Sequence, residues 1–131
     1  MTTLPVTSLY TALLLLLLLA LAVNVVRWRR QAQVSLGDGD HADLRRAIRA
    51  HGNAIEHIPP VMIGLALLEM SGASVLLLHG YGAVFFIARA MHPLGLVRKP
   101  SVNAPRQLGV LVTWIVMLAI AVHLLVTVTV H

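Results

Sequence analysis

The chain contains no cysteine, and only 11% of its 131 residues are charged. The missing cysteine excludes disulfide frameworks, cysteine nucleophiles and thiolate metal sites, so any thiol chemistry must come from a substrate. A soluble domain contains about 25% charged residues. Here 58% of the residues are hydrophobic and the mean hydropathy is +0.84, and so short a chain cannot bury that much apolar surface by itself. The composition predicts an integral membrane protein whose apolar surface faces lipid or sister subunits.

The apolar residues predict an all-α fold of four transmembrane helices, over about residues 8–27, 43–70, 74–97 and 106–130, in one domain spanning residues 1–131. A span needs about 20 residues. The apolar stretch from Ile58 to Met70 is too short, so the second helix must extend back through the polar segment that begins near Asp43. The first stretch lacks the basic region and small-residue cleavage site of a secretory signal, and we expect it to be retained.

Basic residues predict the orientation of the helices. They lie in or beside the first and third connections, namely Arg27, Arg29, Arg30, Arg45, Arg46 and Arg49, then Arg89, Arg98, Lys99 and Arg106. Loops rich in Lys and Arg stay in the cytoplasm, so we expect both termini on the other side of the membrane and an up-and-down bundle. The net charge of +5 does not indicate nucleic acid, because these arginines are juxtamembrane. Membrane lipids are their expected partners.

The start of the second helix is the most informative segment. At about 100° per residue, Arg49, Asn53 and Glu56 fall within roughly 60° of one another, and Arg45 extends this stripe by one turn. An ionisable residue near the bilayer centre costs at least ~2.5 kcal/mol, so such residues normally face the bundle interior or a wet cavity. We therefore expect the stripe of Arg45, Arg49, Asn53 and Glu56 to point inward.

Arg89 and His92, one turn apart in the third helix, are possible partners of this stripe. Glu56 either pairs with Arg89 to close the bundle or contributes to a ligand site, and the two roles are compatible. We expect Asn24 to donate a hydrogen bond between helices. Glu69 and His79 are expected at the solvated rim of the second connection. No spacing joins the histidines at that end into a metal site, and none is predicted.

The second helix resembles a signature of a known membrane family. Arg45 is followed by Arg49-x-x-x-Asn53-x-x-Glu56-x-x-Pro59 and an apolar helix, which looks like the signature of the membrane-associated proteins in eicosanoid and glutathione metabolism, the MAPEG family. The first connection and residues 47–54 look most like its bacterial inner-membrane branch. Matching positions outside the second helix are Arg27, Arg89, His92 and Arg106.

This resemblance implies a homotrimer that binds glutathione between subunits on the cytoplasmic side. Arginines suit the two glutathione carboxylates, a glutamate suits the ammonium and an asparagine suits the peptide groups. By similarity, Arg106 would be the catalytic residue that stabilises the glutathione thiolate, with Arg98 and Lys99 as competing candidates. The glutathione-binding residues would be Arg27, Arg45, Arg49, Asn53, Glu56, Arg89 and His92.

The chain departs from the family where the reaction would take place. Several members have a tyrosine where this chain has Leu96, and some have a serine where it has Gln107. Three functions therefore stay open. The first is a glutathione S-transferase or peroxidase acting on lipophilic electrophiles. The second is a non-catalytic protein that binds a lipid or partner protein in the same intramembrane cleft, and the third is a small transporter or structural membrane subunit.

Overall fold

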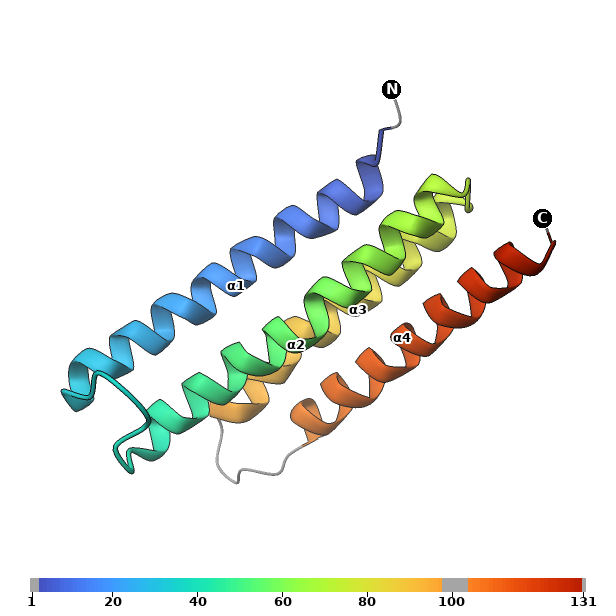
Figure 1. The fold of residues 1–131 in the computed structure, drawn as a ribbon. Coiled ribbons are helices and arrows are strands. Elements are labelled where there is room, and N and C mark those ends of the chain that lie inside the picture. Colours follow the sequence, from blue (N-terminus) through green and yellow to red (C-terminus); the bar gives the residue numbers. More distant parts are fainter. Residues whose placement is uncertain (1–2, 98–103, 131) are drawn as a thin grey trace.

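The computed structural model describes residues 3–97 and 104–130, and its regular elements over those ranges are four helices. The helices are α1 (Pro5–Ala32), α2 (Ala42–Met70), α3 (Val75–Val97) and α4 (Ala104–Val130). They run alternately in opposite directions, so the start of α1 lies at the same end as the end of α4 (Figure 1). This arrangement confirms the predicted all-α, up-and-down bundle.

Three of the helices, α1, α3 and α4, are long and apolar enough to cross a membrane. The 29 residues of α2 give it a length of about 43 Å at 1.5 Å per residue, so it spans the same layer beside them. Its polar first half therefore lies at the same level as the apolar second half of α1. The fold is that of a four-helix membrane protein.

Two prolines lie inside α2, at Pro59 and Pro60. A proline has no N–H, so the carbonyl groups of Ile55 and Glu56 lack their usual helical donors. Both prolines and both of these residues are exposed on the surface of the folded chain. The outer face of α2 thus presents unpaired backbone acceptors beside the carboxylate of Glu56.

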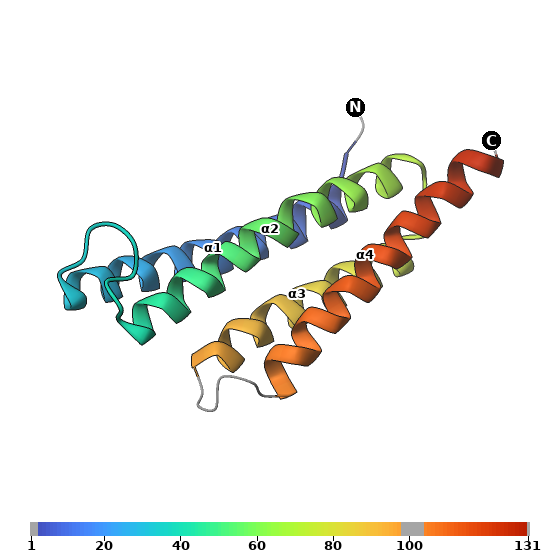
Figure 2. The same ribbon diagram turned by 60° about the horizontal axis from the view of Figure 1, so that its bottom comes forward.

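The four helices pack as two hairpins that face each other. In Figure 2, α1 and α2 form one side and α3 and α4 the other. Over the described residues α2 and α3 make contacts across the middle, whereas α1 and α4 do not contact each other. Fully buried apolar side chains fill the interface, among them Leu14, Leu65, Leu68, Leu78 and Phe85.

At the end opposite the basic loops, Glu69 of α2 caps the start of α1. Its carboxylate accepts hydrogen bonds from the backbone N–H groups of Val6 (2.9 Å) and Thr7 (2.8 Å). Glu69 and His79 lie at the end of the bundle beside the second connection, where both side chains are half-buried and have polar partners on α1. The first turn of α1 has unpaired N–H groups and no acidic residue of its own, so a carboxylate from the neighbouring helix satisfies them.

A close contact between Tyr10 and Gly82 joins the two hairpins at the same end. The Tyr10 hydroxyl lies 3.1 Å from Nδ1 of His79 and donates to the His79 carbonyl oxygen at 3.2 Å. A Cβ added to Gly82 would lie only 2.1 Å from Cδ2 of the Tyr10 ring. Position 82 therefore has no room for a side chain while Tyr10 keeps its place.

We expect Gly82→Ala to lower the free energy of unfolding by about 2 kcal/mol, because the new methyl group must displace the ring and its hydrogen bonds. The measurement is circular dichroism of the micelle-bound protein during titration with sodium dodecyl sulfate. In a Tyr10→Ala background the same substitution should cost much less, since the ring is gone. Equal costs in both backgrounds would contradict this packing.

Candidate functional site

A buried arginine in α3, within the membrane-spanning part of the bundle, forms hydrogen bonds to α2 and α4. Arg89 of α3 is only 2% exposed, and its Nη1 donates to Oδ1 of Asn53 in α2 at 2.7 Å. Its Nη2 donates to the backbone carbonyl of Gly109 in α4 at 2.9 Å. Arg89 thus contacts neutral oxygens rather than Glu56, so the alternative in which Glu56 pairs with Arg89 is not the arrangement in the folded chain.

The contact with α4 depends on Gly109, which the sequence analysis did not single out. A Cβ at this position would lie 2.9 Å from the carbonyl oxygen of Ala88 and 3.1 Å from Cβ of His92. The absence of a side chain lets α4 approach α3 closely enough for its carbonyl to reach Arg89. Thr113 also donates to that carbonyl, at 2.7 Å. A backbone carbonyl leaves no signal in a sequence, so this partner could not have been found there.

His92 lies one helical turn from Arg89, towards the basic loops, and is 4% exposed. It is within electrostatic range of Arg89, Arg106 and His57. Arg106 is half-buried in the first turn of α4, beside a surface depression of about 350 Å³ that Trp114 also lines. The Asn53–Arg89–Gly109 cluster is therefore continued towards the loops by His92 and Arg106. The competing candidates Arg98 and Lys99 lie outside the described residues.

The rest of the predicted stripe on α2 faces outward, which corrects the sequence prediction. Arg45, Arg49 and Glu56 are exposed in the folded chain, and of the four stripe residues only Asn53, at the edge of the stripe, is half-buried. The physical reason is that α2 buries its opposite face against α1, α3 and α4. At about 100° per residue, Arg49 and Glu56 lie about 150° from the middle of that buried face. The buried face consists of Leu44, Ala47, Ala50, Ala54, Ile58, Val61, Met62, Gly64, Leu65 and Leu68.

Arg45 belongs to the first connection rather than to the Arg89 cluster. It forms ion pairs with Asp38 and with Asp40 in the loop between α1 and α2. The hydrogen bond from the Arg45 guanidinium holds the pKa of the Asp38 carboxyl below its usual range. The charge of Arg45 is therefore shared with the loop, one turn before the exposed Arg49.

Arg27 is also separate from the Arg89 cluster within one subunit. Its guanidinium lies 5.4 Å from the ring centroid of Trp28, and it lines a cavity between α1, α2 and α3 together with Asn24. The eight predicted site residues thus fall into three groups. Asn53, Arg89, His92 and Arg106 follow the α2–α3–α4 contact, Arg49 and Glu56 lie on the outer face of α2 with Arg45 at its end, and Arg27 lies in this cavity.

Comparison with known proteins decides the family. The sequence model of the MAPEG family matches residues 7–126. The chain belongs to the MAPEG family. The resemblance in the second helix is thereby confirmed, and the match extends from the first turns of α1 nearly to the end of α4. No solved structure matches the chain.

Two relatives of this MAPEG chain are named as inner membrane proteins. The chain is 37% identical over 113 residues to "Inner membrane protein YecN" of Escherichia coli strain K12, which covers 86% of this chain and 85% of that protein. The protein of the same name in Escherichia coli O6:H1 matches over the same lengths at the same identity. Together with the apolar helices, these relatives support an inner-membrane location.

Proposed function

We propose that this protein binds glutathione in a site completed by a neighbouring subunit of a homotrimer, and that it acts as a glutathione S-transferase or peroxidase. In the transferase reaction the glutathione thiolate forms a bond to a carbon of a lipophilic electrophile, and the leaving group departs from that carbon with the bonding electrons. The observation that carries the proposal is the outward position of Arg49 and Glu56. Glu56 lies about 15 Å deeper along α2 than Arg46, and a charged side chain at such depth rarely faces lipid, because it costs at least ~2.5 kcal/mol near the bilayer centre. A second copy of the chain, with a polar ligand between the two copies, covers this face without that cost.

The groups on this face match the charges of glutathione. Arg49 provides a forked donor for a carboxylate, and the Glu56 carboxylate provides an acceptor for the ammonium. The carbonyl groups released by Pro59 and Pro60 add acceptors beside Glu56. Asn53 uses its side-chain oxygen to hold Arg89, which leaves its amide N–H groups available for a peptide carbonyl. The position of the Asn53 side chain is fixed by its hydrogen bond to Arg89, which is itself buried.

Glutathione binding is tested by thermal unfolding of the detergent-purified protein over a range of glutathione concentrations. We expect a stabilisation that grows with concentration, because a ligand that binds only the folded state shifts the equilibrium. Glu56→Gln and Arg49→Ala should each weaken binding at least about tenfold, which is ~1.4 kcal/mol.

The matched control is Arg30→Ala, which removes another exposed arginine at the end of α1 and should bind glutathione as the wild type does. Two results would count against the proposal. One is an absence of stabilisation at millimolar glutathione. The other is a loss of oligomer and thermal stability in Glu56→Gln while the remaining folded protein still binds normally, which would make Glu56 an assembly residue.

A non-catalytic binding protein is the second candidate, and it is favoured by Leu96 and Gln107 in place of the tyrosine and serine of other members. The two candidates differ in turnover. A transferase consumes glutathione when a lipophilic aryl halide is added in the micelle, whereas the non-catalytic protein binds the thiol without consuming it. Binding without turnover would select the second candidate.

The proposed site requires the basic loops to face the cytosol, where glutathione is plentiful. The one-sided arginines predict that a reporter fused after His131 reads as periplasmic and that one inserted within residues 37–40 reads as cytoplasmic. Alkaline phosphatase and green fluorescent protein fusions measure the two sides independently. Opposite signals would place the site in the wrong compartment for cytosolic glutathione.

A further inference from the structure

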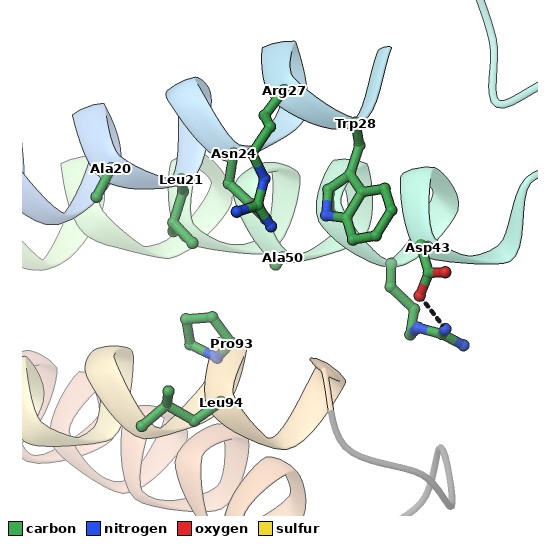
Figure 3. Close-up of a pocket in the computed structure, with 11 residues that line it drawn as sticks. Ala20, Leu21, Asn24, Arg27, Trp28, Asp43, Ala50, Pro93 and Leu94 are labelled. Carbon is green, nitrogen blue, oxygen red and sulfur yellow. Dashed lines mark hydrogen bonds and ion pairs between the residues drawn. The ribbon is translucent and has the colours of Figure 1, made fainter. Parts of the chain in front are cut away.

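The cavity that Arg27 lines lies apart from the Asn53–Arg89–Gly109 cluster. It has a volume of about 250 Å³ and opens between α1, α2 and α3 near the basic loops. Figure 3 shows Arg27 and Trp28 of α1 projecting over it, opposite Pro93 and Leu94 of α3. We name it the α1–α3 cavity. Of the residues predicted to bind glutathione, Arg27 is the one that lines this cavity, and Arg49 and Glu56, which carry the glutathione proposal, lie on the outer face of α2 instead.

The α1–α3 cavity changes in polarity along the bundle axis. Its deep end is lined by Ala20, Leu21 and Leu94, and its end near the loops by Asn24, Arg27 and Arg46. Trp28 lies eight residues after Ala20, which corresponds to about 12 Å along α1. That length covers the step from the hydrocarbon core to the headgroup layer of a bilayer. The lining of the cavity therefore changes from apolar to polar in the same direction as the surrounding leaflet changes from acyl chains to headgroups.

The charges at the polar end leave an excess of one cation. Arg46 is paired with Asp43, which also lines the cavity, whereas Arg27 stacks on the ring of Trp28. Two guanidinium groups and one carboxylate give a net charge of +1, which suits a monoanion such as a phosphodiester. Tryptophan is also the side chain that prefers the headgroup level.

From this arrangement we infer that the α1–α3 cavity binds an anionic phospholipid, with its phosphodiester at Arg27 and Arg46 and the start of an acyl chain against Ala20 and Leu94. Glutathione is a poorer match, because the apolar deep end offers no partner to its second carboxylate or to its ammonium. A volume of about 250 Å³ holds roughly eight groups the size of a water molecule, so only part of the lipid enters it. The inference does not rest on glutathione binding.

Native mass spectrometry of the detergent-purified protein, titrated with phosphatidylglycerol or with phosphatidylcholine of the same acyl chains, tests the inference. We expect the wild type to retain phosphatidylglycerol about tenfold better, as two charge-assisted contacts allow. The double variant Arg27→Gln with Arg46→Gln should lose this preference. Ala20→Phe fills the deep end and should reduce retention of phosphatidylglycerol about tenfold.

Ala12→Phe is the matched control, since Ala12 is exposed on the same helix and does not line the α1–α3 cavity. It should retain lipid as the wild type does. If Ala20→Phe does not fold, Leu94→Trp fills the cavity from α3 and decides the result. Equal retention in the filled and control variants, or no preference for phosphatidylglycerol in the wild type, would overturn the inference. Displacement of the retained lipid by glutathione would also overturn it.

Discussion

Arg89→Ala is expected to lower the free energy of unfolding by about 3 kcal/mol. The substitution removes a large side chain that is 2% exposed, together with its hydrogen bonds to Asn53 and Gly109. The cost has two sources, the cavity left at the meeting point of three helices and the Asn53 oxygen left without its donor. Unfolding by sodium dodecyl sulfate, followed by circular dichroism in micelles, measures it.

Two further variants separate these sources. Arg89→Met removes the same charge and hydrogen bonds but keeps much of the volume, so it should cost less than Arg89→Ala because it leaves a smaller cavity. Arg30→Ala removes an exposed arginine and should change stability by less than ~0.5 kcal/mol. If Arg89→Ala were as mild as Arg30→Ala, the Asn53–Arg89–Gly109 cluster would not hold the helices together.

The second large effect concerns Arg106 and rests on the proposed transferase function. We expect bound glutathione to have a thiol pKa about two units lower than free glutathione, and we expect Arg106→Ala to abolish most of that difference. A thiol with a pKa near 8.5 is only a few per cent ionised at neutral pH. Two units correspond to roughly 2.7 kcal/mol, which one close and poorly solvated guanidinium can supply.

The thiolate absorbance of bound glutathione, recorded against pH, measures this shift directly. The control is Arg30→Ala, which leaves the first turn of α4 unchanged. His92 is near Arg106 and its charge would change the result, so His92→Gln is measured beside it. If wild type and Arg106→Ala both bind glutathione and show the same thiol pKa, Arg106 does not activate the thiol. It is then a positive charge at the start of α4 that sets the topology of the chain.

Much of the fold could be predicted from the sequence because span length is a strict constraint. The apolar run ending at Met70 is too short to cross a bilayer, and the structure extends α2 back to Ala42 through the polar segment. The one-turn spacing of Arg89 and His92 likewise places both in one buried part of α3. These conclusions depend only on helical rise and period.

The orientation of the α2 stripe could not be predicted in the same way. Helical spacing shows that Arg49 and Glu56 share a face, but it does not show whether that face meets the subunit's own core or a neighbour. The small and apolar residues Ala50, Ala54 and Ile58, on the opposite side, were the available signal. The partners of Glu69 and Arg89 include backbone groups of α1 and α4, and backbone groups are the same at every position.

The hydrogen bonds between the start of α1 and Glu69 cannot form until α2 has been synthesised to its last turn. The acceptor lies 63 residues after the backbone N–H of Val6. At about 5–20 residues per second, a ribosome needs roughly 3–13 s to synthesise that length. During this interval the first turn of α1 has only water or headgroups as acceptors, which keeps its end at the membrane surface. The two hydrogen bonds from the start of α1 to Glu69 can therefore form only after the last turn of α2 has been synthesised.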